Sequence, residues 1–202
     1  MEILASSLAA GLLFGMVLAL VALGLTIIFG VMDIINFAHG EIYMIGAFTG
    51  LIVISVLTML GWNSIAIIVL AALIAMLYSA AYGFTIEKIA YKPLRGSQRL
   101  SALISAIGMS LFLQNYVLLA QTSNFLPYPN LVPTLDFLKP YEHIVRSTEI
   151  VIYIATALVM VLLTYLIKFT RMGKAMRAVA QNKTMASLAG INVNRVISYT
   201  FA

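Results

Sequence analysis

The sequence has few charged residues and no cysteine. Only 9% of its 202 residues are Asp, Glu, Lys or Arg, whereas 62% are hydrophobic, and a soluble domain of this length is far less apolar. The absence of cysteine excludes disulfides, thiolate catalysis and cysteine-ligated metal sites. A Gly-x-x-x-x-Gly-Lys phosphate-binding pattern is also absent, so the chain has no sequence signature for hydrolysing ATP itself.

The hydrophobic residues fall into five long windows, each able to cross a bilayer core of about 30 Å as a helix. Lys168, one residue from an end, is the only charged residue or histidine inside any window, and it can reach the interface. A soluble all-helical core is the alternative, but its helices would need a polar face. The sequence therefore predicts an all-α polytopic transmembrane helical bundle, with spans at 8–31, 42–60, 65–86, 100–120 and 150–169.

Orientation is predicted from Lys and Arg. Ten of the twelve basic residues lie in segments 87–99 and 168–195, which the positive-inside rule places in the cytoplasm. The connection 121–149 is then an external loop; it holds four of the five prolines, so we expect an ordered loop without a long helix. Counting spans back from these segments puts residues 32–41 on the cytoplasmic side and the N-terminus outside. Residues 32–41 contain no basic residue, so the alternative that they form a re-entrant segment in the membrane remains.

Four polar residues lie close together between the first two windows: Asp33, Asn36, His39 and Glu41. Polar groups near hydrocarbon are costly, and they mark either a substrate pathway or a water-facing connection. In the second interpretation Asn36 caps the next helix, Gly40 eases a close approach, and His39 binds a carbonyl. Gln114 and Asn115 in the fourth window are further candidates for lining a pathway, because they too need partners inside the membrane.

Catalysis and metal binding find little support in this polar group. His39 and Glu41 are two residues apart, which does not place them on one helix face, and no third ligand is near in sequence. An intramembrane enzyme using His39 with Glu41 or Asp33 is a rival hypothesis, but it lacks a nucleophile or metal set. We therefore predict no catalytic residue, no metal and no cofactor bound by this chain.

Small residues predict two packing features. Gly11 with Gly15, and Gly46 with Gly50, have the spacing that lets membrane helices approach closely, although glycine is common in such helices anyway. In the basic segment, Gly173 and Gly190 bracket a predicted helix from Lys174 to Ala189, with Gly190 as its C-terminal cap. This helix has a face of small residues that fits a partner's groove; the alternative is a solvated loop that only fixes topology. The small face consists of Ala175, Ala178, Asn182, Ala186 and Ala189.

Three blocks of sequence together resemble the branched-chain amino acid permeases of ABC importers, most closely the LivH-type subunits. The first block is Ala22-Leu-Gly-Leu-Thr-Ile-Ile-Phe-Gly-Val31 with Ile35-Asn-Phe-Ala-His-Gly-Glu41 and Tyr43-Met-Ile-Gly46. The second is Ile86-Glu-Lys-Ile-Ala-Tyr-Lys-Pro-Leu-Arg95, continuing through 103–110, and the third combines 171–178 with 185–191. The blocks occur in the family's order and cover nearly the whole chain apart from the external loop.

The resemblance implies a single permease domain over 1–202, with 170–195 as a cytoplasmic coupling segment that docks into an ATPase subunit. It implies coupling roles for Gly173, Arg177, Met185, Ala186 and Gly190. One departure is clear: the common Glu-Ala-Ala-x-x-x-Gly coupling pattern aligns with Thr184, Met185, Ala186 and Gly190, so only the last two agree. Family members are longer, and the apolar run 196–202 is too short to span, so we expect a truncated chain with the start of a further span.

The implied function is ATP-driven import of Leu, Ile or Val across a bacterial inner membrane by alternating access. Implied partners are a second permease subunit, two ATP-binding subunits and a periplasmic or extracellular solute-binding protein. Urea, short amides or another small polar solute form the alternative substrate class. The net charge of +5 needs only anionic lipid headgroups as its counterpart, not nucleic acid.

Overall fold

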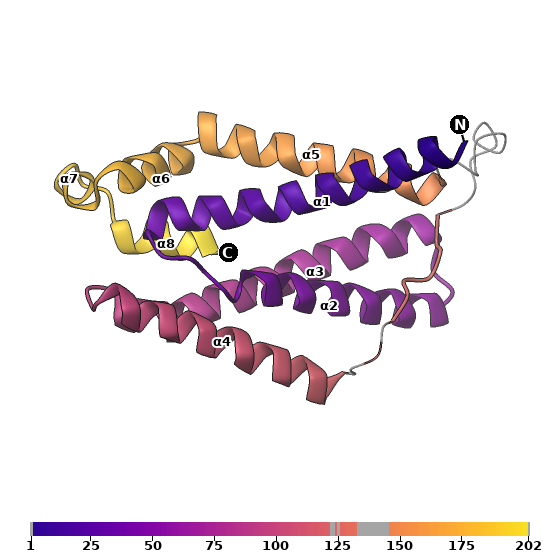
Figure 1. Ribbon diagram of the computed structural model, residues 1–202, viewed down its shortest axis with the longest axis horizontal. Helices are drawn as coiled ribbons and strands as arrows, with labels where there is room; N and C mark the ends of the chain where they lie inside the picture. The colour runs from indigo at the N-terminus through magenta and orange to yellow at the C-terminus, as the bar shows by residue number, and fades with distance from the viewer. Residues whose placement is uncertain (1, 122–123, 125, 133–145, 202) are drawn as a thin grey trace. The chain divides into compact units, whose positions relative to one another are not determined.

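The computed structural model describes residues 2–121, 124, 126–132 and 146–201, and all regular structure within them is helical (Figure 1). Five helices are long and apolar enough to cross a membrane, which confirms the predicted spans. Each begins earlier than predicted, most clearly the first, at residue 2 rather than 8, and the second and fifth, at residues 39 and 147 rather than 42 and 150. The five are α1 (Glu2–Met32), α2 (His39–Met59), α3 (Ser64–Ile86), α4 (Arg99–Ala120) and α5 (Ser147–Phe169).

Shorter helical elements connect or follow these spans. A π-helix, η1 (Glu87–Tyr91), and a 3-10 turn, η2 (Lys92–Leu94), extend α3 into the first basic segment. The second basic segment folds into α6 (Arg171–Gln181) and α7 (Lys183–Leu188), and α8 (Val193–Phe201) follows. Most of the predicted external loop, including Pro133 and Pro140, lies outside the described residues; residues 126–132 have no regular secondary structure.

The chain divides into two compact units, and the first contains residues 1–24 and 129–174. In it, the Tyr153 hydroxyl donates a 2.6 Å hydrogen bond to the Ala9 carbonyl, which ties α5 to α1. The Glu149 carboxylate accepts from the Arg146 N–H at the start of α5. Gly11 and Gly15 do not make the predicted close packing within the described residues, because a Cβ at either would meet no described atom within 4 Å.

The second unit contains residues 25–128 and 175–202, and α2 with α3 forms a helical hairpin in it (Figure 1). The turn between them uses Gly61 at φ +71°, and the Asn63 side chain accepts from the Ile65 N–H to cap α3. The close approach predicted from the second glycine pair is confirmed. A Cβ at Gly46 would lie 2.5 Å from Ser79 Oγ, and one at Gly50 would lie 3.1 Å from Tyr128 Oη.

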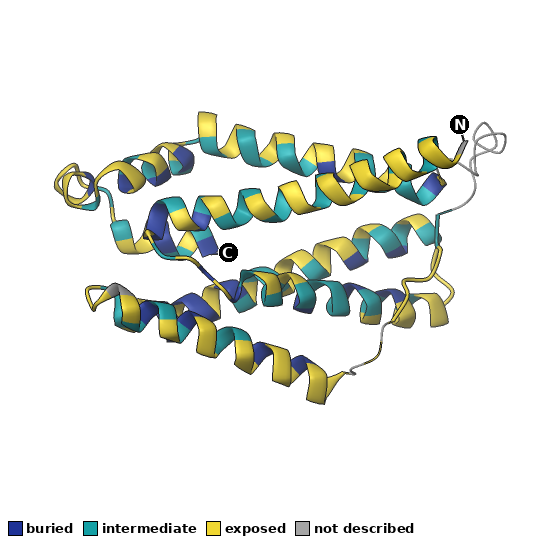
Figure 2. Cartoon of the chain, in the orientation of Figure 1, coloured by how far each residue is buried: buried dark blue, intermediate teal, exposed yellow. Residues whose placement is uncertain are grey.

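Side chains along these helices are largely exposed, including many large apolar ones (Figure 2). Of the five spanning helices, α4 is the most buried, yet only 22% of the residues in its most apolar stretch are buried. Leu77 of α3 and Leu119 of α4 are 71% and 83% exposed. Apolar side chains in such number on the outside of a helical unit fit contact with lipid rather than water.

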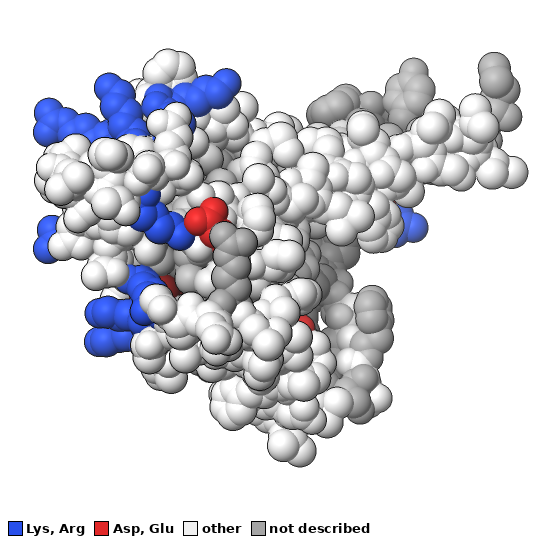
Figure 3. All heavy atoms as spheres, turned by 60° about the vertical axis from the view of Figure 1, so that its left-hand side comes forward, with Lys and Arg blue, Asp and Glu red and all other residues white. Residues whose placement is uncertain are grey.

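One end of the second unit gathers the turn after α1, the first basic segment and the start of α8. Lys183 contacts Asp33, and Arg95 contacts Asn194, so segments 32–41, 87–99 and 182–198 meet there. Figure 3 shows most Lys and Arg side chains of the visible face in groups, some of them next to acidic side chains. Counting the spans between these three segments predicts that they lie on one side of the membrane, and the assignment of that side to the cytoplasm stays a prediction.

Candidate functional site

Asn36 is the buried centre of the turn between α1 and α2. Its side chain is 2% exposed, and its Oδ1 accepts from the Ala38 N–H at 3.0 Å and from the Tyr91 hydroxyl at 2.6 Å. The bond to a backbone N–H two residues on is an Asx-type turn. It differs from the predicted cap, because Ala38 is the N-cap residue of α2 and has no side-chain cap. Asn36 therefore shapes the turn and ties it to η1.

His39 begins α2 immediately after this turn and is half-buried. Its backbone N–H donates to the Asn36 carbonyl at 3.2 Å, so the chain reverses within four residues. No group of three or more His, Cys, Asp and Glu that could hold a metal occurs among the described residues. The bonds of Asn36 give it a structural role in the turn. The close approach predicted at Gly40 is not found, because a Cβ there would meet no described atom within 4 Å. A substrate contact by Asn36 or His39 stays a prediction.

Glu41 and Gln114 meet between α2 and α4, 73 residues apart in sequence. Gln114 Nε2 donates to Glu41 Oε1 at 2.7 Å, and Ser110 Oγ donates to the same oxygen at 3.0 Å. Glu41 thus has one oxygen bound by two donors, in helices whose remaining surface is mostly apolar. Ser110 was not a predicted site residue; its position four residues before Gln114 on one helix face is the signal that could have found it.

Asn115 does not join this cluster, although it follows Gln114. Its Nδ2 donates to the Leu111 carbonyl of its own helix at 2.8 Å. It lines an open groove of about 650 Å³ along α4 together with apolar neighbours such as Phe112 and Leu119. Adjacent helical residues point about 100° apart, so one amide reaches α2 while the next faces the groove.

The predicted coupling helix is two helices, and this corrects the expectation of one helix from Lys174 to Ala189. The first of the two, α6, begins at Arg171, and Thr170 Oγ1 accepts from the Gly173 N–H at 3.0 Å at its start. Gly173 is therefore inside α6, and a Cβ there would overlap the Leu166 and Ile167 carbonyls. Asn182 ends the first helix, and its Oδ1 caps α7 by accepting from the Met185 N–H at 3.0 Å. The predicted small-residue face is broken at this residue, because a side chain that caps a helix competes with helix propagation.

Gly190 is the C-terminal cap that the sequence predicts. It has φ +84°, its N–H donates to the Ser187 carbonyl, and the Ile191 N–H donates to the Ala186 carbonyl. These two bonds form a Schellman motif, for which a residue without Cβ is strongly favoured. Ala186 is buried, whereas Met185 is 63% exposed, so α7 presents an apolar side chain outwards.

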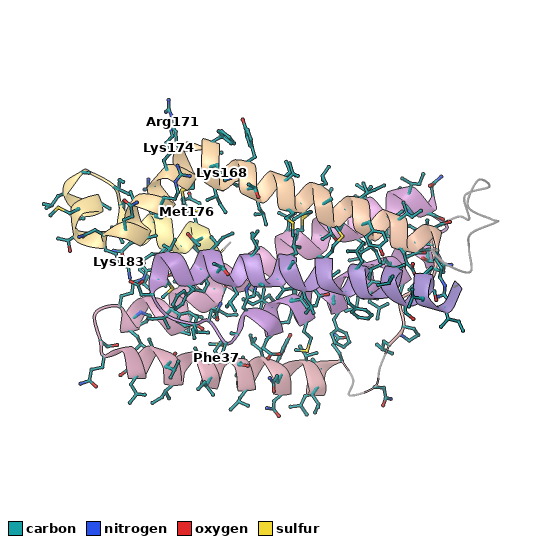
Figure 4. All side chains as sticks on the ribbon, turned by 45° about the horizontal axis from the view of Figure 1, so that its top comes forward. Phe37, Lys168, Arg171, Lys174, Met176 and Lys183 are labelled. Atoms are coloured by element: carbon teal, nitrogen blue, oxygen red, sulfur yellow. The ribbon has the colours of Figure 1, made fainter. Side chains whose placement is uncertain are left out.

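Arg177, the remaining predicted coupling residue, and the other basic side chains of this segment divide between exposed and anchored positions. Arg177 is exposed on α6, and in the first unit the side chains of Lys168, Arg171 and Lys174 point outwards (Figure 4). Lys183 instead binds the end of α1, where its Nζ donates to the Met32 carbonyl and to Asp33 Oδ2, both at 2.9 Å. Asp33 has φ +61°, which is unusual for a residue with a side chain. The ion pair of Lys183 with Asp33 could not be predicted from the sequence, since nothing in the spacing links residues 150 positions apart.

A second anchor joins η1 to α8. Glu87 is 1% exposed and forms an ion pair with Arg95, and Ser198 Oγ donates to Glu87 Oε2 at 2.8 Å. Burial lowers the pKa of the Arg95 guanidinium, and the Glu87 charge opposes this effect. The signal in the sequence is that Glu87 is the only acid in the basic segment 87–99.

Comparison with known proteins finds similarity over almost the full chain. A family model described as "branched-chain amino acid transport system / permease component" matches residues 7–202. The high-affinity branched-chain amino acid transport system permease protein LivH of Salmonella typhimurium is 45% identical over 195 residues, covering 95% of this chain and 63% of the relative. LivH of Escherichia coli and the corresponding permease protein BraD of Pseudomonas aeruginosa are each 44% identical, covering 95% of this chain and 63% and 64% of the relatives. The chain thus spans less than two thirds of these relatives' length, and no solved structure matches.

Proposed function

We propose a transport function for this chain because it belongs to the family of permease components of branched-chain amino acid transport systems. It provides the membrane-spanning path of an ATP-driven importer, which moves Leu, Ile or Val across a bacterial inner membrane by alternating access. Its partners are a second permease subunit, two ATP-binding subunits and a solute-binding protein. Five apolar helices and the identity to permease proteins over 95% of the chain support this proposal.

The observation that carries the substrate assignment is the cluster of Glu41, Ser110 and Gln114. An amino acid crossing hydrocarbon needs partners for both its ammonium and its carboxylate. The Glu41 carboxylate can accept from the ammonium, and the Gln114 amide can turn its N–H groups towards the carboxylate. Both lie on spanning helices, where a polar pair without a function would be costly to keep.

Asn36 and His39 have a different role in this proposal: they set the shape of the turn that leads into α2. The two acceptor contacts of Asn36 are satisfied within the chain, so substrate would have to displace Tyr91 to reach that oxygen. Asn115, which lines the groove along α4, is the remaining candidate for a polar contact along the path.

The segment 170–195 connects the path to the ATP-binding subunits. On α7, Met185 and Leu188 are 63% and 77% exposed, while the N-terminal end is held by Lys183. A short helix with exposed apolar side chains and an anchored N-terminal end is suited to insertion into a groove of another protein. ATP hydrolysis takes place on those partner subunits, and closure of the partners moves this segment.

The test is uptake by the complete protein with its partner subunits, reconstituted in proteoliposomes with ATP enclosed and the binding protein outside. Radiolabelled leucine should accumulate only with hydrolysable ATP, and Glu41→Gln should abolish most of the uptake while ATP-binding subunits still co-purify. Glu149→Gln, at the start of α5 and not a member of the cluster, is the matched control and should keep most of the uptake. Uptake of urea or a short amide in place of leucine would establish the alternative substrate class, and leucine uptake unaffected by Glu41→Gln would contradict the assignment of the cluster.

A further inference from the structure

The buried carboxylate of Glu87 is held by residues of two distant segments. Arg95 forms its ion pair, and Ser198 of α8 donates to its other oxygen at 2.8 Å. Arg95 Nη1 in turn donates to Asn194 Oδ1 of α8 at 2.6 Å. A charge with 1% exposure persists only when it is paired and hydrogen-bonded; here Arg95 supplies the paired charge, and Ser198 of α8 supplies a hydrogen bond.

The backbone around Glu87 is a single turn of π-helix, a form that accounts for well under 1% of residues and is frequent at functional sites. Three elements bind this turn. Ser105 Oγ of α4 donates to the Ala90 carbonyl at 3.0 Å, and the Tyr91 hydroxyl donates to Asn36. The same five residues thus contact α8 through Glu87, α4 through Ala90 and the 32–41 turn through Tyr91.

α8 is joined to this turn by more than the polar contacts. Asn194 and Ser198 are four residues apart and therefore lie on one face of α8. The Phe201 and Tyr91 rings lie 5.4 Å apart, and Gly83 lets the Phe201 carbonyl approach so closely that a Cβ would overlap it. Only four residues separate α7 from α8, so a displacement of α7 reaches α8 without a long flexible link.

We propose that Glu87 and Arg95 are positioning residues that transmit movement of the coupling segment, through α8 and η1, to the turn at residues 32–41, in addition to the direct contact of Lys183 with Asp33 and the Met32 carbonyl. The pair holds α8 to the π-helical turn, and Tyr91 passes the displacement to Asn36 at the entrance of α2. This inference rests on the proposed transport function. Replacing a buried ion pair by well-packed apolar side chains is often neutral or stabilising, so stability alone does not account for these charges, whereas a role in transmitting movement does.

The test uses a thiol on the turn as a reporter of its movement. Residues 1–202 contain no cysteine, so Ile35→Cys introduces one thiol into this segment, at a position that is 44% exposed, and its labelling is read on the peptide that contains residue 35. In the assembled transporter, ATP should change the rate of thiol labelling, and Glu87→Gln should reduce this change on the order of tenfold while ATP hydrolysis stays within about twofold. Lys88→Gln, an exposed neighbour, is the control and should leave the change intact.

Two outcomes overturn the proposal: a labelling rate that is the same with and without ATP, or an ATP response that Glu87→Gln leaves unaltered. If Glu87→Gln does not assemble, Ser198→Ala and Asn194→Ala remove single hydrogen bonds from the α8 side and keep the ion pair. Each should reduce the response about two- to threefold, and an unchanged response in both overturns the proposal equally. Failure of leucine uptake with an intact ATP-dependent labelling change would instead refute the substrate assignment alone.

Discussion

Replacing Asn36 by alanine should destabilise the protein far more than replacing Asn115, although the two amides are comparable in the sequence. Asn36→Ala leaves the Tyr91 hydroxyl and the Ala38 N–H without the acceptor that they share, at 2.6 Å and 3.0 Å. Each buried donor without a partner costs about 1–3 kcal/mol. The wild-type Asn36 Nδ2 is itself buried and has no partner among the described residues, so its removal returns part of this loss. We expect a net destabilisation of about 3 kcal/mol.

A loss of that size lowers the apparent melting midpoint of a chain of about 200 residues by roughly 6–12 °C. The measurement is thermal unfolding of the purified complete protein, in which samples are heated to a series of temperatures and the remaining folded protein is quantified by size-exclusion chromatography. Asn115→Ala is the control: its amide is exposed and, within the described part of the chain, bonds to the Leu111 carbonyl of its own helix, so the change should stay within about 0.5 kcal/mol. An Asn36→Ala protein with a wild-type midpoint and reduced leucine uptake would refute the structural role and return Asn36 to the substrate pathway.

Three further outcomes follow from contacts in the second unit. Gly83→Ala should cost about 1–3 kcal/mol of stability in the same assay, because its Cβ overlaps the Phe201 carbonyl, whereas Gly108→Ala meets no described atom and should not destabilise. Lys183→Met should cost at most about 1 kcal/mol, because both partners of its ion pair are substantially exposed; a loss above 3 kcal/mol by the same unfolding assay would show that the pair is shielded. Ser110→Ala should raise the KM for leucine uptake by a smaller factor than Glu41→Gln, since it removes one of the two donors to Glu41 and leaves the charge; an equal effect of both would contradict a charge-based contact.

The spans were predictable because charged side chains are excluded from hydrocarbon, so each span appears in the sequence as a long stretch without charges. The Schellman cap at Gly190 was predictable for a similar reason, since a glycine after a helical pattern is a local stop signal. The break of the coupling helix at Asn182 was not predicted, because an Asn is tolerated inside a helix and only its capping bond to the Met185 N–H reveals the break.

The candidate site was only partly predictable from the sequence. Glu41 and Gln114 were both expected to be polar groups that need partners, but their pairing depends on how α2 and α4 pack. The bond from Tyr91 to Asn36 joins residues 55 positions apart, and nothing about Tyr91 within the basic segment 87–99 indicates this partner. Long-range side-chain pairs of this kind depend on tertiary packing rather than on periodicity, so a single sequence does not specify them.

The tight turn between α2 and α3 has a consequence for how the protein enters the membrane during synthesis. Residues 60–63 are Leu, Gly, Trp and Asn, and none of them carries an ionisable side chain. Moving this turn through hydrocarbon therefore requires no charge to be transferred, and Asn63 already binds a backbone N–H of α3. The two helices can enter the bilayer as a preformed hairpin, which the basic residues after α3 then prevent from sliding further through the membrane.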